Sequence, residues 1–174
     1  RLTAAAKGRS SDDETTVDAL MTVDNGRLEI VGGHFELSVV PNRPVLPWFL
    51  DAHNGGFSIE RCEITSLPGD ASQTPGLVRW RHDAKSDVPQ GTQVGIIRDS
   101  FLVAGGTLID AQIRQQQLFI DNSILVSPGT LFALDVAGAL RDSAGSVVLQ
   151  QSTLSAATTF FDVTNPTPHD SRRA

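Results

Sequence analysis

A short pattern of apolar and small residues recurs five times along this chain of 174 residues. Each copy has a large aliphatic residue, two turn-forming residues, a small residue and then a new apolar segment. The copies occupy residues 30–35, 59–64, 97–102, 120–125 and 149–154, and their starts lie 29, 38, 23 and 29 residues apart. A repeat of this length that is built from strand-forming residues is typical of stacked coils.

A second pattern has the same period. Six apolar segments end on an aspartate, at Asp24, Asp51, Asp83, Asp110, Asp135 and Asp162. Because two independent patterns share one period, we predict three short strands in each coil. One strand ends at the aliphatic residue, one follows the small residue and one ends at the aspartate.

Alternation of apolar and polar residues within the strands predicts which side chains face the core. In the segment 77–83 it directs Val78 and Trp80 inward and Arg79 and Arg81 outward. Equivalent residues of successive coils are expected to stack about 4.8 Å apart, which is the spacing of paired strands.

These patterns predict an all-β fold, namely a single-stranded right-handed parallel β-helix of about five three-strand coils. The domain is expected to cover residues 17–164, with a mobile linker at 1–16 and a tail at 165–174. The right hand follows from the general hand of parallel crossover connections. An antiparallel β-sandwich is the alternative, although its equivalent strands need not recur in phase.

The repeat over residues 18–163 resembles the right-handed, pectin-lyase-like β-helix family, and this resemblance implies a fold rather than a chemistry. The segments 47–51, 56–62 and 118–123 also resemble β-helical regions that follow the kinase domain in some planctomycete serine/threonine kinases. That second resemblance implies an extracytoplasmic sensor region of a receptor-like kinase. The sequence contains no kinase motif of its own.

Composition narrows the classes of partner. The formal net charge of −6 disfavours a nucleic-acid backbone as a partner. No apolar stretch approaches the roughly 20 residues that span a bilayer. The single cysteine, Cys62, excludes an intrachain disulfide and occupies the small-residue position of its repeat, so we expect it to be packed at a corner.

The aspartates are the first candidate site. The alternation predicts an outward column of Asp51, Asp83, Asp110, Asp135 and Asp162, with Arg81 between the levels of Asp51 and Asp110. Such carboxylates bond the backbone of a tight turn, or they bind a cation or the hydroxyls of a glycan. Glycoside hydrolysis also uses paired carboxylates, but the carboxylate, histidine and basic clusters of β-helical polysaccharide enzymes are missing.

Histidines suggest one further arrangement, in which Asp51 and His53 neighbour His82 and Asp83 on the next coil. Because the alternation buries His82 beside Trp80, we interpret this histidine as structural. We therefore assign no catalytic residue, no metal ligand and no cofactor.

Two outward apolar columns form the second candidate site. Ile96, Phe119 and Val148 form one column, and Phe101 and Ile124 belong to the next sheet. Strands that are apolar on both faces are usually covered on both faces, so these columns predict a protein or interdomain contact. The alternatives are that the register changes after the corner, or that a linker segment folds over these columns.

The leading hypothesis is a non-catalytic β-helical scaffold or binding module of a larger bacterial, cell-surface or extracytoplasmic protein, with a protein or a glycan as its partner. The alternatives are a carbohydrate-active hydrolase or lyase that uses the aspartate column, and the sensor region of a receptor-like kinase.

Overall fold

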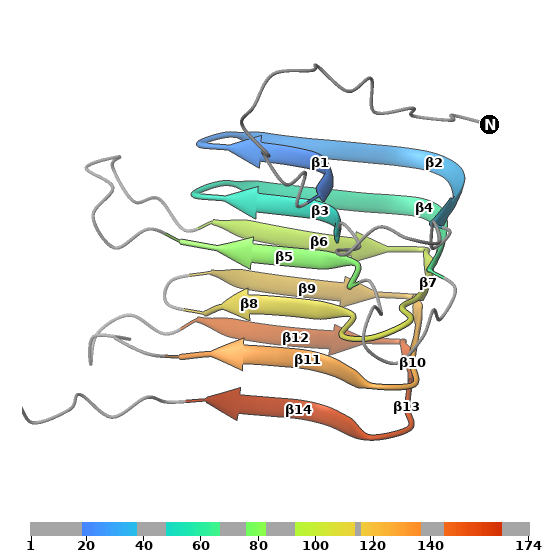
Figure 1. Ribbon diagram of the computed structural model, residues 1–174. Helices are drawn as coiled ribbons and strands as arrows, with labels where there is room; N and C mark the ends of the chain where they lie inside the picture. The colour runs from blue at the N-terminus through green and yellow to red at the C-terminus, as the bar shows by residue number, and fades with distance from the viewer. Residues whose placement is uncertain are drawn as a thin grey trace, which may run out of the picture.

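The computed structural model describes residues 19–37, 48–66, 76–82, 93–113, 116–136 and 145–164 (Figure 1). Within these ranges the chain forms fourteen β-strands and no helix. The predicted linker at 1–16, the predicted tail at 165–174 and Asp83 lie outside the described residues. The strands are β1 (Ala19–Asp24), β2 (Arg27–Leu37), β3 (Trp48–His53), β4 (Gly56–Ser66), β5 (Val78–Arg81), β6 (Val94–Arg98), β7 (Phe101–Val103), β8 (Ile109–Gln112), β9 (Gln117–Asp121), β10 (Ile124–Ser127), β11 (Thr130–Asp135), β12 (Ser146–Gln150), β13 (Thr153–Ala156) and β14 (Thr159–Thr164).

The strands form two curled sheets in which every pairing is parallel. The first sheet has six strands in the order β1-β3-β5-β8-β11-β14. The second has eight strands in the order β12-β9-β6-β4-β7-β10-β13, with β2 also paired to β4. The chain alternates between the sheets, and we call each run through the first sheet and then the second a pass. Each strand pairs with its equivalent in the next pass, so the passes descend in Figure 1 from β1 to β14. The predicted all-β class is confirmed.

The second sheet has two wings that share the long strand β4. Residues 57–60 of β4 pair with β6, and residues 63–65 pair with β7. The bend between the wings falls at the third position of the repeat, where the backbone is left-handed in every pass. These residues are Gly32 (φ 69°), Arg61 (φ 54°), Asp99 (φ 51°), Asn122 (φ 45°) and Gln151 (φ 49°).

The small residue after each bend forms a hydrogen-bonded ladder from pass to pass. The hydroxyl of Ser123 donates to the carbonyl oxygen of Asp121 at 2.8 Å and accepts from the backbone N–H of Ser100 at 3.1 Å. Ser100 and Ser152 repeat this arrangement in the passes before and after. The ladder satisfies backbone groups at the sharp bend, which explains why three of the five copies of the repeat have a serine here.

Cys62 occupies the same position and is buried, as predicted. Its Sγ lies 3.3 Å from the carbonyl oxygen of Glu60, in place of the serine hydroxyl. Burial raises the pKa of the thiol, so its reactive thiolate form is suppressed.

The aliphatic residues of the repeat stack as one row between the sheets, as predicted. The pairings run Ile30, Ile59, Ile97, Ile120 and Leu149. The three central members are buried, whereas Leu149 in the final pass is partly exposed. The vertical alignment of the repeat is confirmed.

Aromatic side chains fill the middle of the core. The ring of Phe57 meets that of Trp80 edge-on, with 5.2 Å between centroids, and the indole N–H of Trp80 donates to the carbonyl oxygen of Gly55 at 2.7 Å. A Cβ added at Gly95 would lie 2.8 Å from the Phe57 ring, so only glycine leaves room for that ring.

One buried row was missed by the alternation rule. Where the chain enters the first sheet, two consecutive residues of a pass are buried, because the corner directs both inward. The additional buried residues are Phe49, Leu77, Leu108 and Leu131. Phe49 lies against Phe35, with 5.2 Å between ring centroids, so its side chain belongs to the core.

Ser123→Ala is expected to lower the free energy of unfolding by about 1–3 kcal/mol, because it leaves the buried N–H of Ser100 without its acceptor, whereas the carbonyl of Asp121 still accepts from the N–H of Asp99. Urea denaturation measures the change. Ser155→Ala, at an exposed position of β13, serves as the control and should change stability by less than about 0.5 kcal/mol. Equal stability of the two variants would show that the ladder contributes nothing.

Candidate functional site

The aspartates do not form the single column predicted from their spacing. Asp51 pairs with Arg79, and Arg79 pairs with Asp110. Asp162 of β14 lies opposite Ala133 of β11. Asp135 lies two residues beyond Ala133 in β11, opposite Thr164. The prediction was wrong because alternation determines which face a residue occupies but not its register, and the aspartate ends the apolar segment at two different levels.

Arg79, rather than Arg81, separates the carboxylates of the first sheet. Its guanidinium forms an ion pair with the carboxylate of Asp51, and both side chains are mostly buried. The guanidinium carbon also lies 5.8 Å from the centroid of the Trp48 ring, which is within cation–π distance. Loss of either partner would leave a buried charge, so this pair is a structural feature of the outer face of β3 and β5.

The carboxyl group of Asp110, on β8, has a shifted pKa. Burial raises its pKa, and the neighbouring guanidinium groups of Arg81 and Arg79 offset part of the increase. The carboxylates of Asp135 and Asp51 add to it. Arg81 is exposed, and in the strand register it lies opposite His53 of β3. Its charge therefore acts on the Asp110 carboxyl group from two residues beyond Arg79 in β5.

Asp83, one member of the suggested histidine grouping, lies outside the described residues. Nδ1 of His53 lies 3.3 Å from Oδ1 of Asp24, one pass above, and Nδ1 of His82 lies 3.4 Å from Nε2 of Gln93. Among the described residues no set of three His, Cys, Asp or Glu side chains could hold a metal ion.

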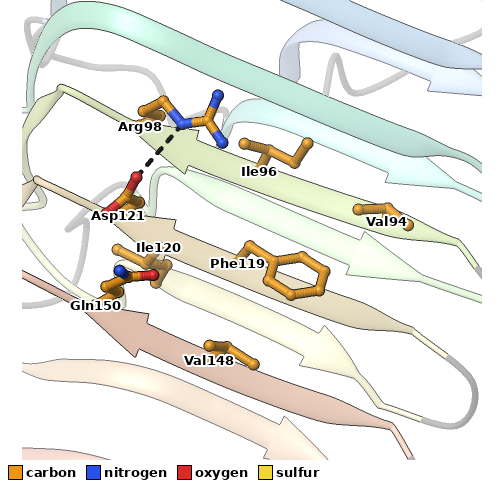
Figure 2. Close-up of a pocket in the computed structure, with 8 residues that line it drawn as sticks. All are labelled: Val94, Ile96, Arg98, Phe119, Ile120, Asp121, Val148 and Gln150. Atoms are coloured by element: carbon orange, nitrogen blue, oxygen red, sulfur yellow. Dashed lines mark ion pairs between the residues drawn. The ribbon is translucent and has the colours of Figure 1, made fainter.

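The first apolar column is present as predicted. Ile96 pairs with Phe119, and Phe119 pairs with Val148, across β6, β9 and β12. Phe119 and Val148 are exposed on the outer face of these strands. We call these three residues the apolar ridge. Figure 2 shows their side chains projecting from three neighbouring strands on one side of the sheet.

A shallow hollow of about 260 Å³ lies along this ridge. Its polar end is formed by the next row of the same strands, where Nε of Arg98 lies 3.5 Å from Oδ2 of Asp121, with Gln150 beyond (Figure 2). The lining residues are Val94, Ile96, Arg98, Phe119, Ile120, Asp121, Val148 and Gln150. The sequence interpretation missed Arg98 and Asp121, although their place beside the left-handed corner was visible in the repeat.

The ridge ends sharply toward the first passes. Ile96 pairs on its other side with Ser58, and Ser58 pairs with Glu29. The row therefore changes from polar to apolar between β4 and β6, with Ser58 buried and Glu29 exposed.

The second column is also present. Phe101 pairs with Ile124 across β7 and β10, and both are exposed. A polar corner separates this column from the apolar ridge, and there the amide of Asn122 donates to Oδ1 of Asp99 at 2.6 Å. The two columns therefore form two narrow strips on different wings.

No protein-family model, curated protein or solved structure matches this chain. In the part of the chain that the structure describes, no helix is long and apolar enough to cross a membrane.

Asp110→Asn is expected to stabilise the protein near neutral pH, and this gain should shrink as the pH falls. Because the native pKa of Asp110 is raised, the native state binds its proton more tightly than the unfolded chain does, and acid relieves the cost of burying the charge. Asparagine carries no such cost at any pH. Urea denaturation of both proteins at neutral and acidic pH measures the difference, and a gain that is constant or grows in acid would contradict the assignment.

Proposed function

We propose that this protein is a non-catalytic binding module, built as a single-stranded right-handed parallel β-helix, which binds a partner protein through the apolar ridge. The parallel pairing of each strand with its equivalent in the next pass supports this architecture. The general right hand of parallel crossover connections and the resemblance to pectin-lyase-like proteins support the hand.

The apolar ridge is the observation on which the function rests. The core does not need apolar residues on this face, because Ser58 and Glu29 occupy the same row in the earlier passes. Phe119 and Val148 nevertheless remain exposed, next to the charged pair of Arg98 and Asp121. An apolar centre with a polar rim is the usual composition of a protein contact.

The narrowness of the ridge indicates the form of the partner. The ridge contributes one side chain from each of three strands, whereas a standard interface between folded domains uses about 20–30 residues on each side. An extended segment that inserts apolar side chains between Ile96, Phe119 and Val148 matches this surface better. The polar row from Arg98 to Gln150 would then bond the backbone of that segment.

One observation favours the alternative of a carbohydrate-active enzyme, namely the raised pKa of Asp110 near a second carboxylate, Asp51. Hydrolysis requires the sugar to reach both groups. Arg79 lies between them in the stack and forms an ion pair with Asp51, so it fills the space that the sugar ring would need. We therefore prefer the binding module.

Phe119→Lys is expected to weaken partner binding at least about tenfold, which corresponds to the loss of a hot-spot side chain. The partner is represented by peptides selected from a random displayed library against the immobilised chain. Their affinities for wild type and variant are compared by calorimetry. Phe101→Lys is the matched control, because it places the same charge on the exposed strip of the other wing and should leave these affinities unchanged.

Peptides that bind Phe119→Lys as tightly as wild type would contradict the proposal, as would a selection that enriches no peptide. A glycan array provides the opposing test. Glycan ligands whose binding is lost in Phe119→Lys would show that the ridge binds carbohydrate instead.

A further inference from the structure

The polar end of the hollow contains a carboxylate that has too few hydrogen-bond donors. Oδ2 of Asp121 lies 3.5 Å from Nε of Arg98, which is longer than a charge-assisted hydrogen bond. Oδ1 is out of contact with solvent and has no hydrogen-bond partner in the part of the chain that the structure describes. A carboxylate accepts several hydrogen bonds, and covering it without them costs free energy. Asp121 therefore has the capacity to accept a donor from a ligand.

The neighbours of Asp121 leave its charge only partly compensated. In the strand register Glu60, Arg98, Asp121 and Gln150 form one row, and the two acids and one arginine give this row a formal charge of −1. Arg98 lies between the two carboxylates, so its single positive charge is shared. Glu60 also accepts a hydrogen bond from the hydroxyl of Ser58 at 2.7 Å. The other neighbour of Asp121 is the neutral Gln150.

Asp121 lies within reach of a segment bound on the apolar ridge. It follows Phe119 by two residues on β9, so both side chains project on the same face, about 7 Å apart along the strand. Figure 2 shows Asp121 between Arg98 and Gln150, with the side chains of the ridge alongside. The long side chains of lysine and arginine cover this distance from a backbone that lies over the ridge, whereas shorter polar side chains do not.

We propose that the segment bound by the apolar ridge carries a lysine or an arginine, and that the carboxylate of Asp121 binds its cationic group. This inference rests on the proposed function, because it needs an extended segment over the ridge. The cation would donate to Asp121 from the side of Gln150, where it is farthest from Arg98. A turn about the last side-chain bond of Asp121 brings either oxygen to the donor, since that bond has a broad energy well.

Charge complementarity favours this basic segment over an acidic one. A carboxylate from the partner would have to pair with Arg98, whose guanidinium already lies in register between Glu60 and Asp121. The formal net charge of −6 on the chain also attracts a basic segment and repels an acidic one. The volume of the hollow, about 260 Å³, is below the roughly 300–1,000 Å³ of most small-molecule sites, so individual side chains fit it better than a whole small ligand.

Asp121→Asn tests the inference, because it keeps the size of the side chain and removes its charge. Peptides selected from a random displayed library against the wild-type chain are expected to contain a basic residue beside apolar ones. Their affinities for Asp121→Asn, measured by calorimetry, should be about tenfold lower than for wild type. Asp99→Asn is the matched control, because it removes the same charge at an exposed corner and should change these affinities by less than about twofold. Urea unfolding of both variants confirms that they remain folded.

Replacing the basic residue of the peptide by glutamine completes a double-mutant cycle. This change should weaken binding to wild type about tenfold and leave binding to Asp121→Asn nearly unchanged, because the charge that it would pair with is already absent. Arg98→Gln distinguishes the sign of the bound charge. Removing the neighbouring cation should leave the affinities unchanged or raise them, whereas a partner carboxylate bound by Arg98 would make them fall.

The two levels of the hypothesis fail in different ways. Peptides that need Phe119 but bind Asp121→Asn as tightly as wild type would overturn this inference alone, as would peptides whose affinity falls in Arg98→Gln. A selection that enriches no peptide, or peptides that bind Phe119→Lys as tightly as wild type, would overturn the proposed function and this inference with it.

Discussion

The in-register stacking of each pass on the next is the constraint on which the other features depend. Parallel pairing requires equivalent residues to lie beside one another, and the left-handed corner with its serine ladder repeats that requirement in every pass. Ser100 and Ser123 connect consecutive corners through buried hydrogen bonds, so a shift of one residue would break the ladder as well as the sheet. Corner and core therefore support the same register.

The same register also arranges the side chains that point away from the core. Residues placed opposite each other on the inside have neighbours that are also opposite on the outside. In the first sheet this brings Arg79 between Asp51 and Asp110, and in the second it aligns Ile96, Phe119 and Val148. The first sheet therefore carries a row in which an arginine lies between two aspartates, and the second sheet carries an exposed apolar strip. Both rows result from one repeat.

The amino-acid sequence by itself determined the all-β class, the period, the core row from Ile30 to Ile120 and the exposed ridge, because these depend on local alternation and on spacing within each repeat. Only the tertiary structure decided that Arg79, not Arg81, pairs with Asp51, and that Phe49 points into the core. The reason is physical: the face of a residue follows from its own strand, whereas its neighbours follow from the lengths of the turns between strands. The burial of Asp110 likewise depends on those neighbours.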